Sequence, residues 1–446
     1  MVPESRISPL MARRIPQSRL SRLMQLGRLA GGLAGGALGE GVRQLSQGQR
    51  PSMQDLLLIP SNAGRLADRL AEMRGAAMKV GQLLSMEAGE FLPREFSQAL
   101  KRLRDEAHTM PLIQLKHVLD ADWGQGWEKR FRHFSYAPVA AASIGQVHEA
   151  VTREGQRLAI KIQYPGIRDS IDSDVNNVAG MLKLFRLIPE AIDFEPLLAE
   201  AKKQLHQEAD YLREAEWLIQ VAERLDGHPR FEAPAVIASL TTSRVLAMSY
   251  LEGRPIEDLD QADAAERNRV AAALLDLSLR EVFEWGLVQT DPNFANFRYA
   301  GDGRIQLLDF GAARQYPEER REAFRAIVKA GVEGAPAAIE RAAIRVGYLG
   351  SADPSNYRAG IVDLIATATE PARHRGGYDF GRSDLARRAS EKVIDLRLRE
   401  KFGRLPPPDI LFLHRKLGGL YLLFRHLRTT LPVRAMVEPF ITVGVS

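Results

Sequence analysis

Hydrophobic positions recur at helical spacing through much of the chain. Between residues 63 and 90, apolar side chains return about every third or fourth position, which predicts a helix. The run at 195–226 is rich in charged residues and is predicted as one long helix. Proline breaks such as Pro406–Pro408 separate helical runs near the end of the chain. Further helices are predicted at 93–104, 112–119, 264–285 and 317–331.

Short extended segments lie between these helices. An aromatic stretch at 126–136 leads into an extended region, and Leu158–Lys161 is predicted as a strand. Residues 243–253 are predicted to form a strand that ends in a glycine-containing turn. A short apolar run, Ile305–Leu308, comes directly before Asp309. The pattern therefore predicts a mixture of helices and short strands.

The stretch Gly286–Arg314 carries three groups suited to magnesium-nucleotide chemistry. Asp291 and Asn296 are spaced D-x-x-x-x-N, and Asp309 opens a D-F-G triplet thirteen residues after Asn296. In kinase-like sites this spacing provides a catalytic carboxylate, a metal-binding amide and a second metal-binding carboxylate. Mg²⁺ prefers such oxygen ligands. The alternative is a turn-forming Asp-Pro-Asn followed by a strand-ending aspartate, both ordinary in loops.

A second motif favours the nucleotide interpretation. The kinase phosphate loop G-x-G-x-x-G-x-V is present with alanine at its first two glycine positions, Ala140 and Ala142, followed by Gly145 and Val147. Fourteen residues later Lys161 ends the sequence L-A-I-K, which matches the strand whose lysine holds nucleotide phosphates. The alternative is a strand-end lysine in solvent. Because Lys161 precedes the other two motifs in the expected order, we predict that it binds phosphate.

Two other segments contain candidate polar residues. Lys79 and Gln82 are three residues apart and share a helix face, although both could simply be exposed. In the charged run, Asp210 and Glu214 are four apart and share a face. Glu208 lies about 200° around the helix from Asp210. Either Glu208 and Asp210 have different partners, or the helix is irregular between them.

Composition narrows the possible chemistry. The chain has 446 residues, of which 45% are hydrophobic and 26% charged, as expected for a globular protein of two or three packed units. It contains no cysteine, which excludes disulfides, thiolate zinc sites and cysteine nucleophiles. A chain without cysteine is compatible with a reducing compartment.

The formal net charge of +5 is concentrated in the first fifty residues. This tail holds eight arginines against Glu4 and Glu40, a net charge of +6, so the remainder is close to neutral. A nucleic-acid binder would carry its basic face on a folded domain, so we predict no nucleic-acid partner. An arginine-rich tail with few acidic residues instead favours anionic membrane lipids or a targeting role.

The sequence has no window of 18 or more apolar residues, so it predicts no conventional membrane span. Leu29–Leu38 is glycine-rich and has the small-xxx-small spacing that lets membrane helices approach closely. A flexible glycine linker is an equally good interpretation of this stretch.

Together these motifs resemble the UbiB-type, or AarF-domain, family of atypical protein-kinase-like proteins of ubiquinone (coenzyme Q) biosynthesis. The resemblance is strongest to the branch of coenzyme Q kinase-like ATPases and covers roughly residues 63–437. The matching motifs are K-V-G-Q (79–82), A-A-A-S-I-G-Q-V-H (140–148), A-I-K-I-Q-Y-P-G (159–166), S-D-V-N-N (173–177), E-A-D-Y-x-R-E-A (208–215), Q-T-D-P-N-x-x-N-F (289–297) and L-L-D-F-G-A-x-R (307–314).

The resemblance implies an α+β, bilobal protein-kinase-like fold with a helical N-terminal extension and a largely helical C-lobe. It implies four segments: a basic, glycine-containing tail at 1–50, a helical extension with the K-x-G-Q motif at 51–135, a kinase-like N-lobe at 136–250 and a kinase-like C-lobe at 251–446.

The resemblance also implies roles for the polar residues of the extension and the N-lobe. Lys79 and Gln82 are the family's signature pair, on an extension that folds over the place where a peptide would bind. Glu208 and Asp210 are its Glu-x-Asp pair, set against that extension. Lys161 pairs with Glu214 and contacts phosphates. The alanine-rich loop of Ala140, Ala141, Ala142 and Ser143 replaces the glycine loop.

In the C-lobe, the resemblance places Asp291 at the catalytic-base position and gives Asn296 and Asp309 to the metal. The adenine hinge falls at Met248, Ser249, Tyr250 and Leu251. Members bind ATP with Mg²⁺ and show ATPase activity that membranes or lipids stimulate. The chain lacks an A-P-E motif and has no room for a long activation segment, so peptide phosphorylation is disfavoured.

The function expected from this resemblance is that of an ATP-dependent atypical kinase or ATPase supporting quinone biosynthesis at a membrane. Its expected partners are ATP, anionic membrane lipids, and quinone-biosynthesis enzymes or lipid precursors. We expect a cytoplasmic protein at the inner membrane in a bacterium, or one on the matrix side in a mitochondrion. Many bacterial members carry a C-terminal membrane segment. No such segment is predicted in this sequence, so the N-terminal tail is expected to make the membrane contact. The alternative is a nucleotide-gated scaffold, a pseudokinase that organises quinone-biosynthesis enzymes.

Overall fold

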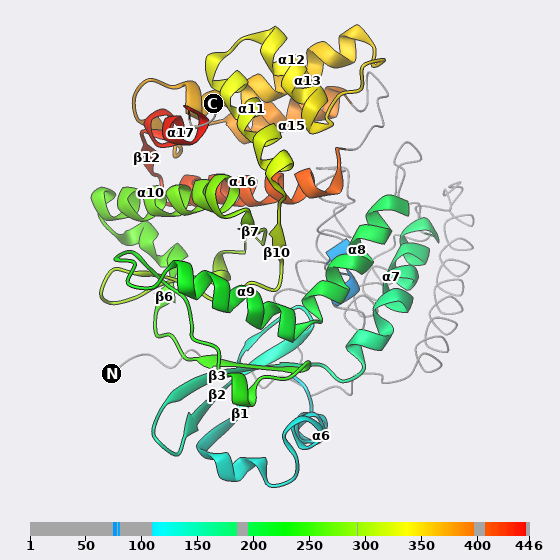
Figure 1. The fold of residues 1–446 in the computed structure, drawn as a ribbon, viewed down its shortest axis with the longest axis vertical. Helices are drawn as coiled ribbons and strands as arrows, with labels where there is room; N and C mark the ends of the chain where they lie inside the picture. Colours follow the sequence, from blue (N-terminus) through cyan, green and yellow to red (C-terminus); the bar gives the residue numbers. More distant parts are fainter. Residues whose placement is uncertain are drawn as a thin grey trace, which may run out of the picture. The chain divides into compact units, whose positions relative to one another are not determined.

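The structure, a computed structural model, describes residues 75–77, 79–80, 109–184, 195–291, 293–396 and 406–442 (Figure 1). The basic tail, the glycine-rich stretch and Gln82 lie outside these residues. The chain forms two compact units. Unit 1 comprises the described residues up to Ile219 together with Ala235–Tyr250, and unit 2 comprises Gln220–Pro234 and the described residues from Leu251 onward.

Unit 1 is built on a four-stranded antiparallel sheet. Its strands are β1 (Phe131–Ala141), β2 (Gly145–Thr152), β3 (Arg157–Gln163) and β5 (Val245–Ser249), in the order β1-β2-β3-β5. The predicted strand at Leu158–Lys161 is therefore present as the central part of β3. β1 begins at Phe131, before the predicted start of the N-lobe at residue 136.

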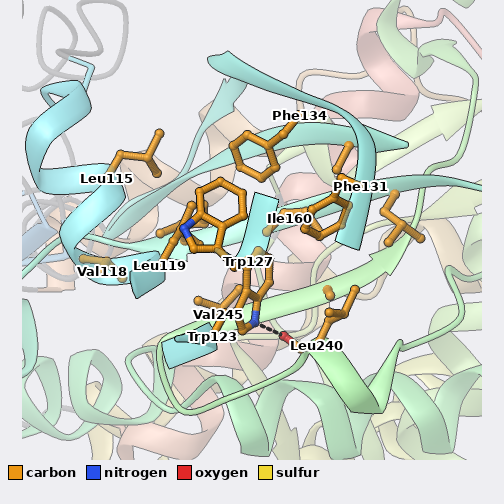
Figure 2. Packing of buried hydrophobic residues seen from close by; sticks show 14 of the residues in the cluster. Leu115, Val118, Leu119, Trp123, Trp127, Phe131, Phe134, Ile160, Leu240 and Val245 are labelled. Carbon is orange, nitrogen blue, oxygen red and sulfur yellow. Dashed lines mark hydrogen bonds between the residues drawn. The ribbon is translucent and has the colours of Figure 1, made fainter. Parts of the chain in front are cut away.

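Aromatic side chains cover one part of this sheet (Figure 2). They come from α6 (Leu112–Trp123), the 3₁₀ turn η2 (Trp127–Arg130) and β1, and they pack around Ile160 of β3. The rings of Trp127 and Phe134 meet edge to face with centroids 4.9 Å apart. The indole of Trp123 donates to the Leu240 carbonyl at 2.9 Å, so its polar atom is satisfied inside the core.

The helices of the charged run at 195–226 correct one prediction. The single helix predicted for 195–226 is wrong, because α8 (Glu195–Glu208) ends before α9 (Tyr211–Arg224) begins. Asp210 lies at the break, and its carboxylate accepts from the Arg213 backbone N–H at 3.3 Å. A carboxylate that caps the first turn of a helix favours a new start over continuation. α8 packs against α7 (Ile167–Leu184), beside which it lies in Figure 1.

Unit 2 contains the short strands that flank the D-x-x-x-x-N and D-F-G motifs. β4 (Phe231–Glu232), β6 (Arg254–Pro255), β8 (Phe297–Tyr299) and β9 (Ile305–Leu307) form a sheet in the order β4-β9-β8-β6. A separate antiparallel pair joins β7 (Leu287–Gln289) to β10 (Ala313–Gln315). The η3 turn (Ala238–Leu240) belongs to unit 1, whereas η4 (Ile256–Gln261) and η6 (Phe294–Asn296) belong to unit 2.

Helices make up most of unit 2. α10 ends at Arg280, and a π-helical turn follows where the sequence predicted a continuous helix up to Trp285. α10 packs against α16 and α17, and α11 packs against α12, α14 and α17. The bounds are α10 (Ala264–Arg280), η5 (Glu281–Trp285), α11 (Glu318–Glu333), α12 (Pro336–Val346), α13 (Ser355–Ala368), α14 (Glu370–Arg373), β11 (Tyr378–Asp379), α15 (Leu385–Ile394), α16 (Pro408–His426), β12 (Thr430–Leu431) and α17 (Val433–Thr442).

Two further features bear on function. After the D-F-G triplet only β10 and a short link precede α11, so the predicted lack of a long activation segment is confirmed. Among the residues that the structure describes, no helix has the length and apolar character needed to cross a membrane. The mixture of sheets with a largely helical unit 2 agrees with the predicted α+β class.

Candidate nucleotide-binding residues

The predicted phosphate lysine lies in a buried ion pair. β3 holds Lys161 between Val147 of β2 and Leu246 of β5. Its Nζ donates to the two carboxylate oxygens of Glu214 at 2.7 and 2.9 Å, and the side chains are only 8% and 2% exposed. The ammonium also lies 5.2 Å from the ring centroid of Tyr211, at the start of α9. The alternative of a solvent-exposed strand-end lysine is therefore wrong.

The alanine loop continues directly from β1. Ala140 and Ala141 still pair with β2, and the Ala142 N–H donates to the Gly145 carbonyl at 2.9 Å. Among the described non-glycine residues, Arg428 is the one with a positive φ, so the alanines adopt ordinary backbone conformations. Their contact with phosphates remains a prediction.

Glycine is required at position 145 because atoms of Ile162 and Tyr211 lie close to its Cα, not because its φ angle is unusual. A Cβ at this position would lie 2.4 Å from the Ile162 carbonyl oxygen and 2.7 Å from the Tyr211 hydroxyl oxygen. Any side chain here would therefore push β3 or α9 away from the loop. This packing explains why the third glycine of the phosphate-loop pattern is retained although the first two positions are alanine.

The helical extension is joined to the same loop through Glu208. Lys79 is buried and forms an ion pair with Oε1 of Glu208, whose Oε2 accepts from the Ser143 hydroxyl at 3.1 Å. A Cβ on Gly75 would lie 3.0 Å from the Ile144 side chain and 3.2 Å from the Ser143 carbonyl oxygen. The extension helix thus approaches the loop closely where it carries Lys79.

Glu208 and Asp210 have different partners, and the helix is also broken between them. The Glu208 carboxylate faces Lys79 and Ser143, whereas the Asp210 carboxylate accepts from the backbone of its own chain at Arg213. Both alternatives raised by the sequence therefore hold together. The role of Gln82 stays a prediction, because it lies outside the described residues.

Met248 to Leu251, the predicted adenine hinge, follows the end of the unit 1 sheet. β5 ends at Ser249, and the chain passes from unit 1 to unit 2 between Tyr250 and Leu251. The Ser249 and Tyr250 N–H groups already donate to the Ala235 and Arg157 carbonyls at 2.8 and 3.0 Å. Adenine recognition at this segment stays a prediction and would have to use other groups.

In unit 2, Asp291 and Asn296, the predicted catalytic-loop pair, are held by local structure. Asp291 follows β7, and Asn296 closes the 3₁₀ turn η6 directly before β8. The Asn296 amide donates to Oδ2 of Asp291 at 3.3 Å, and the Asn296 carbonyl accepts from the Leu308 N–H at 3.0 Å. The D-x-x-x-x-N spacing therefore brings the two side chains together.

The D-F-G triplet lies beside that loop. β10 pairs antiparallel with β7, and the Gln289 side chain donates to the Asp309 carbonyl at 3.3 Å. Oδ1 of Asp309 accepts from the Gly311 N–H at 2.9 Å, while Phe310 is buried. The turn after β9 thus fixes the backbone that carries the Asp309 carboxylate.

These residues are of the type that binds Mg²⁺. Because the Asn296 amide nitrogen donates to Asp291, its amide oxygen faces elsewhere and can accept a hard cation, as can the Asp309 carboxylate. Among the described residues, no group of three or more histidine, cysteine or acidic side chains is placed to hold a metal ion. Asn296 and Asp309 each offer one oxygen-bearing side chain, which suits an ion that is held jointly with nucleotide phosphates.

Two basic residues on α16 were not predicted from the sequence. Arg415 forms an ion pair with Oδ1 of Asp291. Lys416, the next residue, pairs with Glu281 and donates to the Gln289 carbonyl at 2.9 Å. Burial raises the pKa of the Glu281 carboxyl, an effect that the ammonium of Lys416 opposes. The available signal was the pair of charges inside an otherwise apolar run, L-F-L-H-R-K-L-G-G-L at 411–420.

Comparisons with known proteins place this geometry in context. The model of the family described as "ABC1 atypical kinase-like domain" matches residues 102–342. The chain is 36% identical over 426 residues to "Atypical kinase COQ8, mitochondrial" of Saccharomyces cerevisiae, covering 94% of this chain and 84% of that protein. It is 35% identical over 429 residues to "Atypical kinase COQ8B, mitochondrial" of Rattus norvegicus, covering 96% and 81%.

A solved structure is also similar. It is titled the complex of Rv3197 with erythromycin from Mycobacterium tuberculosis, with a TM-score of 0.58, 25% sequence identity, and coverage of 86% of this chain and 96% of that one. Together with the family match, this similarity confirms the predicted protein-kinase-like fold.

Proposed function

The chain belongs to the ABC1 family of atypical kinase-like proteins, and from this premise we propose that it binds Mg-ATP and cleaves off its terminal phosphoryl group. The hydrogen bond between Asn296 and Asp291 carries the proposal, in a loop that follows β7, the partner of the strand β10 after the D-F-G triplet. It brings together the carboxylate and amide that phosphoryl transfer requires.

The side chains have separate roles in this proposal. Lys161, oriented by Glu214, binds nucleotide phosphates. Asp291 orients the acceptor hydroxyl or water and takes its proton. Asn296 and Asp309 would hold Mg²⁺, which would offset the negative charge of the nucleotide phosphates. The alanine loop and the segment Met248–Leu251 complete the proposed nucleotide contacts.

The biological role that we propose is support of coenzyme Q biosynthesis. It follows from the family resemblance and from relatives named as COQ8 atypical kinases over most of this chain. Enzymes of quinone synthesis, or its lipid precursors, are the proposed partners. A conventional protein-kinase activity is disfavoured, because β10 leads almost directly into α11 and leaves no long segment to dock a peptide.

One observation favours a second candidate, a nucleotide-gated scaffold. Both carboxylate oxygens of Asp291 already have partners, because Oδ1 pairs with Arg415 and Oδ2 accepts from the Asn296 amide. In a scaffold, nucleotide binding would change the conformation and turnover would be incidental. The phosphoryl-transfer proposal instead requires the carboxylate of Asp291.

Binding is tested by nucleotide-dependent thermal stabilisation. A ligand that binds only the folded protein stabilises it by about 2.7 kcal/mol at a hundred times its Kd. We expect ATP to raise the melting temperature only with Mg²⁺, and Asp309→Asn to abolish most of that rise. Asp258→Asn, an exposed aspartate of η4, is the matched control and should respond like the wild type. An equal rise without Mg²⁺ would contradict the proposal.

Asp291→Asn separates the two candidate functions. We expect this variant to retain Mg-ATP stabilisation but to lose ATP hydrolysis. In cells lacking the endogenous gene, it should then fail to restore quinone levels if turnover is needed. Full restoration by Asp291→Asn would favour the scaffold instead.

We further propose that the N-terminal tail contacts an anionic membrane surface, on the cytoplasmic side of a bacterial inner membrane or the matrix side of a mitochondrial one. Each arginine near such a surface contributes on the order of 1 kcal/mol, which salt weakens. The full chain should sediment with phosphatidylglycerol-containing vesicles at low salt. Replacing the eight tail arginines by glutamine should release it, and equal sedimentation of both forms would reject the tail as the anchor.

A further inference from the structure

The catalytic loop has no positive charge of its own. Between Asp291 and Asn296 the sequence reads P-N-F-A, without a basic residue. The positive charge comes instead from Arg415 on α16, 124 residues away in the chain. Arg415 also lies outside residues 102–342, the part of the chain that the family model matches. The positive charge beside Asp291 is therefore supplied from a helix that is distant in the sequence.

The guanidinium of Arg415 is only partly used. Its Nη2 pairs with Oδ1 of Asp291, and the side chain is 8% exposed. Its Nη1 is buried and has no hydrogen-bond partner within the described part of the chain. A buried donor on a charged group is costly when it is left unsatisfied. An anionic oxygen next to Asp291 would satisfy it, and a planar guanidinium can serve two oxygen partners at once.

The neighbouring contacts hold Arg415 in place. Lys416 is committed to Glu281 and to the Gln289 carbonyl, which ties α16 to the residue that ends β7. On the same helix, the ring centroid of Phe412 lies 3.6 Å from the guanidinium carbon of Arg314. Arg314 belongs to β10, the strand that follows the D-F-G triplet. α16 is thus fixed to the segments on both sides of the catalytic loop. Among the basic residues of α16, Arg415 therefore keeps a buried N–H donor, Nη1, that has no hydrogen-bond partner in the described part of the chain.

We propose that Nη1 of Arg415 binds an oxygen of the phosphoryl group whose transfer Asp291 assists. This inference rests on the proposed function. In the step, the bond between the γ-phosphorus and the ADP oxygen breaks, a bond to the acceptor oxygen forms, and the acceptor's proton passes to Asp291. Arg415 exchanges no proton and stabilises the charge on the phosphoryl oxygens, as arginines supplied in cis do in other phosphoryl-transfer enzymes.

The test uses ADP with aluminium fluoride and Mg²⁺, in which aluminium fluoride mimics the phosphoryl group in the transition state of its transfer. A group that acts on the transferring phosphoryl binds this mimic more tightly than ADP alone. Wild-type protein should show an additional rise in melting temperature with the mimic. In Arg415→Gln, Mg-ADP stabilisation should remain, whereas affinity for the mimic should fall about tenfold or more, as expected for a charged hydrogen bond.

Two further variants keep the test decisive. Arg415→Lys retains a positive charge near Asp291 but not the two-pronged donor, so it should also lose most of the additional rise, and it carries the test if Arg415→Gln does not fold. Arg425→Gln, an exposed arginine on the same helix, should behave like the wild type. A merely structural Arg415 would lower ADP and mimic stabilisation equally in both Arg415 variants.

The outcomes separate this inference from the function on which it rests. If wild-type protein shows no Mg-nucleotide stabilisation, the proposed function fails and this inference falls with it. If the wild type responds and Arg415→Gln keeps the full additional rise, the role of Arg415 alone is overturned. An equal loss with ADP and with the mimic overturns it as well, and reduces Arg415 to a support for Asp291.

Discussion

Lys161 and Glu214 form a buried pair in which one ammonium donates to both oxygens of one carboxylate, at 2.7 and 2.9 Å. Both side chains are almost completely buried, so each charge is compensated by its partner and not by water. Glu214 lies in the first turn of α9, which begins at Tyr211 after α8 has ended at Glu208. The two hydrogen bonds therefore hold the Lys161 ammonium in one position.

Removing one partner of this pair should destabilise the protein strongly. We expect Lys161→Met or Glu214→Gln to lower the free energy of unfolding by about 3–5 kcal/mol, because an uncompensated charge or polar group is left buried. Urea denaturation without nucleotide measures this loss. The exposed pair Arg387–Glu391 on α15 is the control, and its removal should change stability little. Equal effects at the two pairs would mean that Lys161 is not buried in solution.

Two glycine-to-alanine substitutions should have opposite effects. Gly145→Ala places a methyl group 2.4 Å from the Ile162 carbonyl oxygen, so we expect a loss of about 1–3 kcal/mol as the loop and β3 separate. Gly180→Ala, in α7, meets nothing within 4 Å and should gain about 0.5–1 kcal/mol from helix propensity. Thermal unfolding compares them, and a neutral Gly145→Ala would refute the close packing of this loop.

Acidification should lower the free energy of unfolding through His148, a residue of unit 1. This fully buried ring stacks on Phe134, with Nδ1 bonded to the Ser135 carbonyl at 2.8 Å and Nε2 to the Gln146 side chain at 2.7 Å. Burial lowers its pKa below the ordinary 6.5, although the bond to Ser135 opposes this shift. Below pH 6.5 the unfolded chain therefore binds a proton that the folded chain does not, and stability falls as the pH drops.

The His148 contribution is measured by urea unfolding between pH 7.5 and 5.5, followed by tryptophan fluorescence. His148→Gln should reduce the dependence of stability on pH, whatever its effect on stability itself. His133→Gln, at an exposed position of β1, should leave the slope unchanged. An unchanged slope in the His148 variant would show that its ring is not held neutral by burial.

The alanine loop should restrain phosphoryl transfer to protein. We expect Ala142→Gly to keep the fold while altering the preference between ATP and ADP or enabling self-phosphorylation, because glycine opens conformations that alanine enters only with strain. Nucleotide titration and radiolabel transfer measure this effect. Labelling should disappear in the double variant with Asp291→Asn. No change in binding, hydrolysis or labelling would mean that the loop carries no such control.

Features set by local spacing could be predicted from sequence alone. Four intervening residues were enough to anticipate that Asp291 and Asn296 would meet, because both belong to one loop and need no distant partner. The strand around Lys161 was also predictable, because the sequence L-A-I-K matches a motif that occupies a strand in kinase-like proteins. Family resemblance added Glu214 as the partner of Lys161, a pairing that spacing by itself did not single out.

The helix break between Glu208 and Asp210 shows where local pattern stops being sufficient. Helical periodicity over 195–226 was strong, and the angular separation of the two carboxylates showed only that something had to differ. Tertiary contacts decide the outcome, because Glu208 reaches Lys79 and Ser143 while Asp210 caps the next helix. Helix propensity favours a single helix only by small increments per residue, so the local pattern did not exclude a break at this point.

Arg415 marks the limit most clearly. Its partner Asp291 lies 124 residues earlier, so no periodicity or motif spacing connects the two. The packing of α16 against α10, and the contacts that Lys416 and Phe412 make beside β7 and β10, bring the guanidinium to that carboxylate. Sequence specified the chemical groups on each loop and strand. Which buried charges neutralise one another was decided only when the helices packed, because charges taken out of water need a partner that folding alone can bring near.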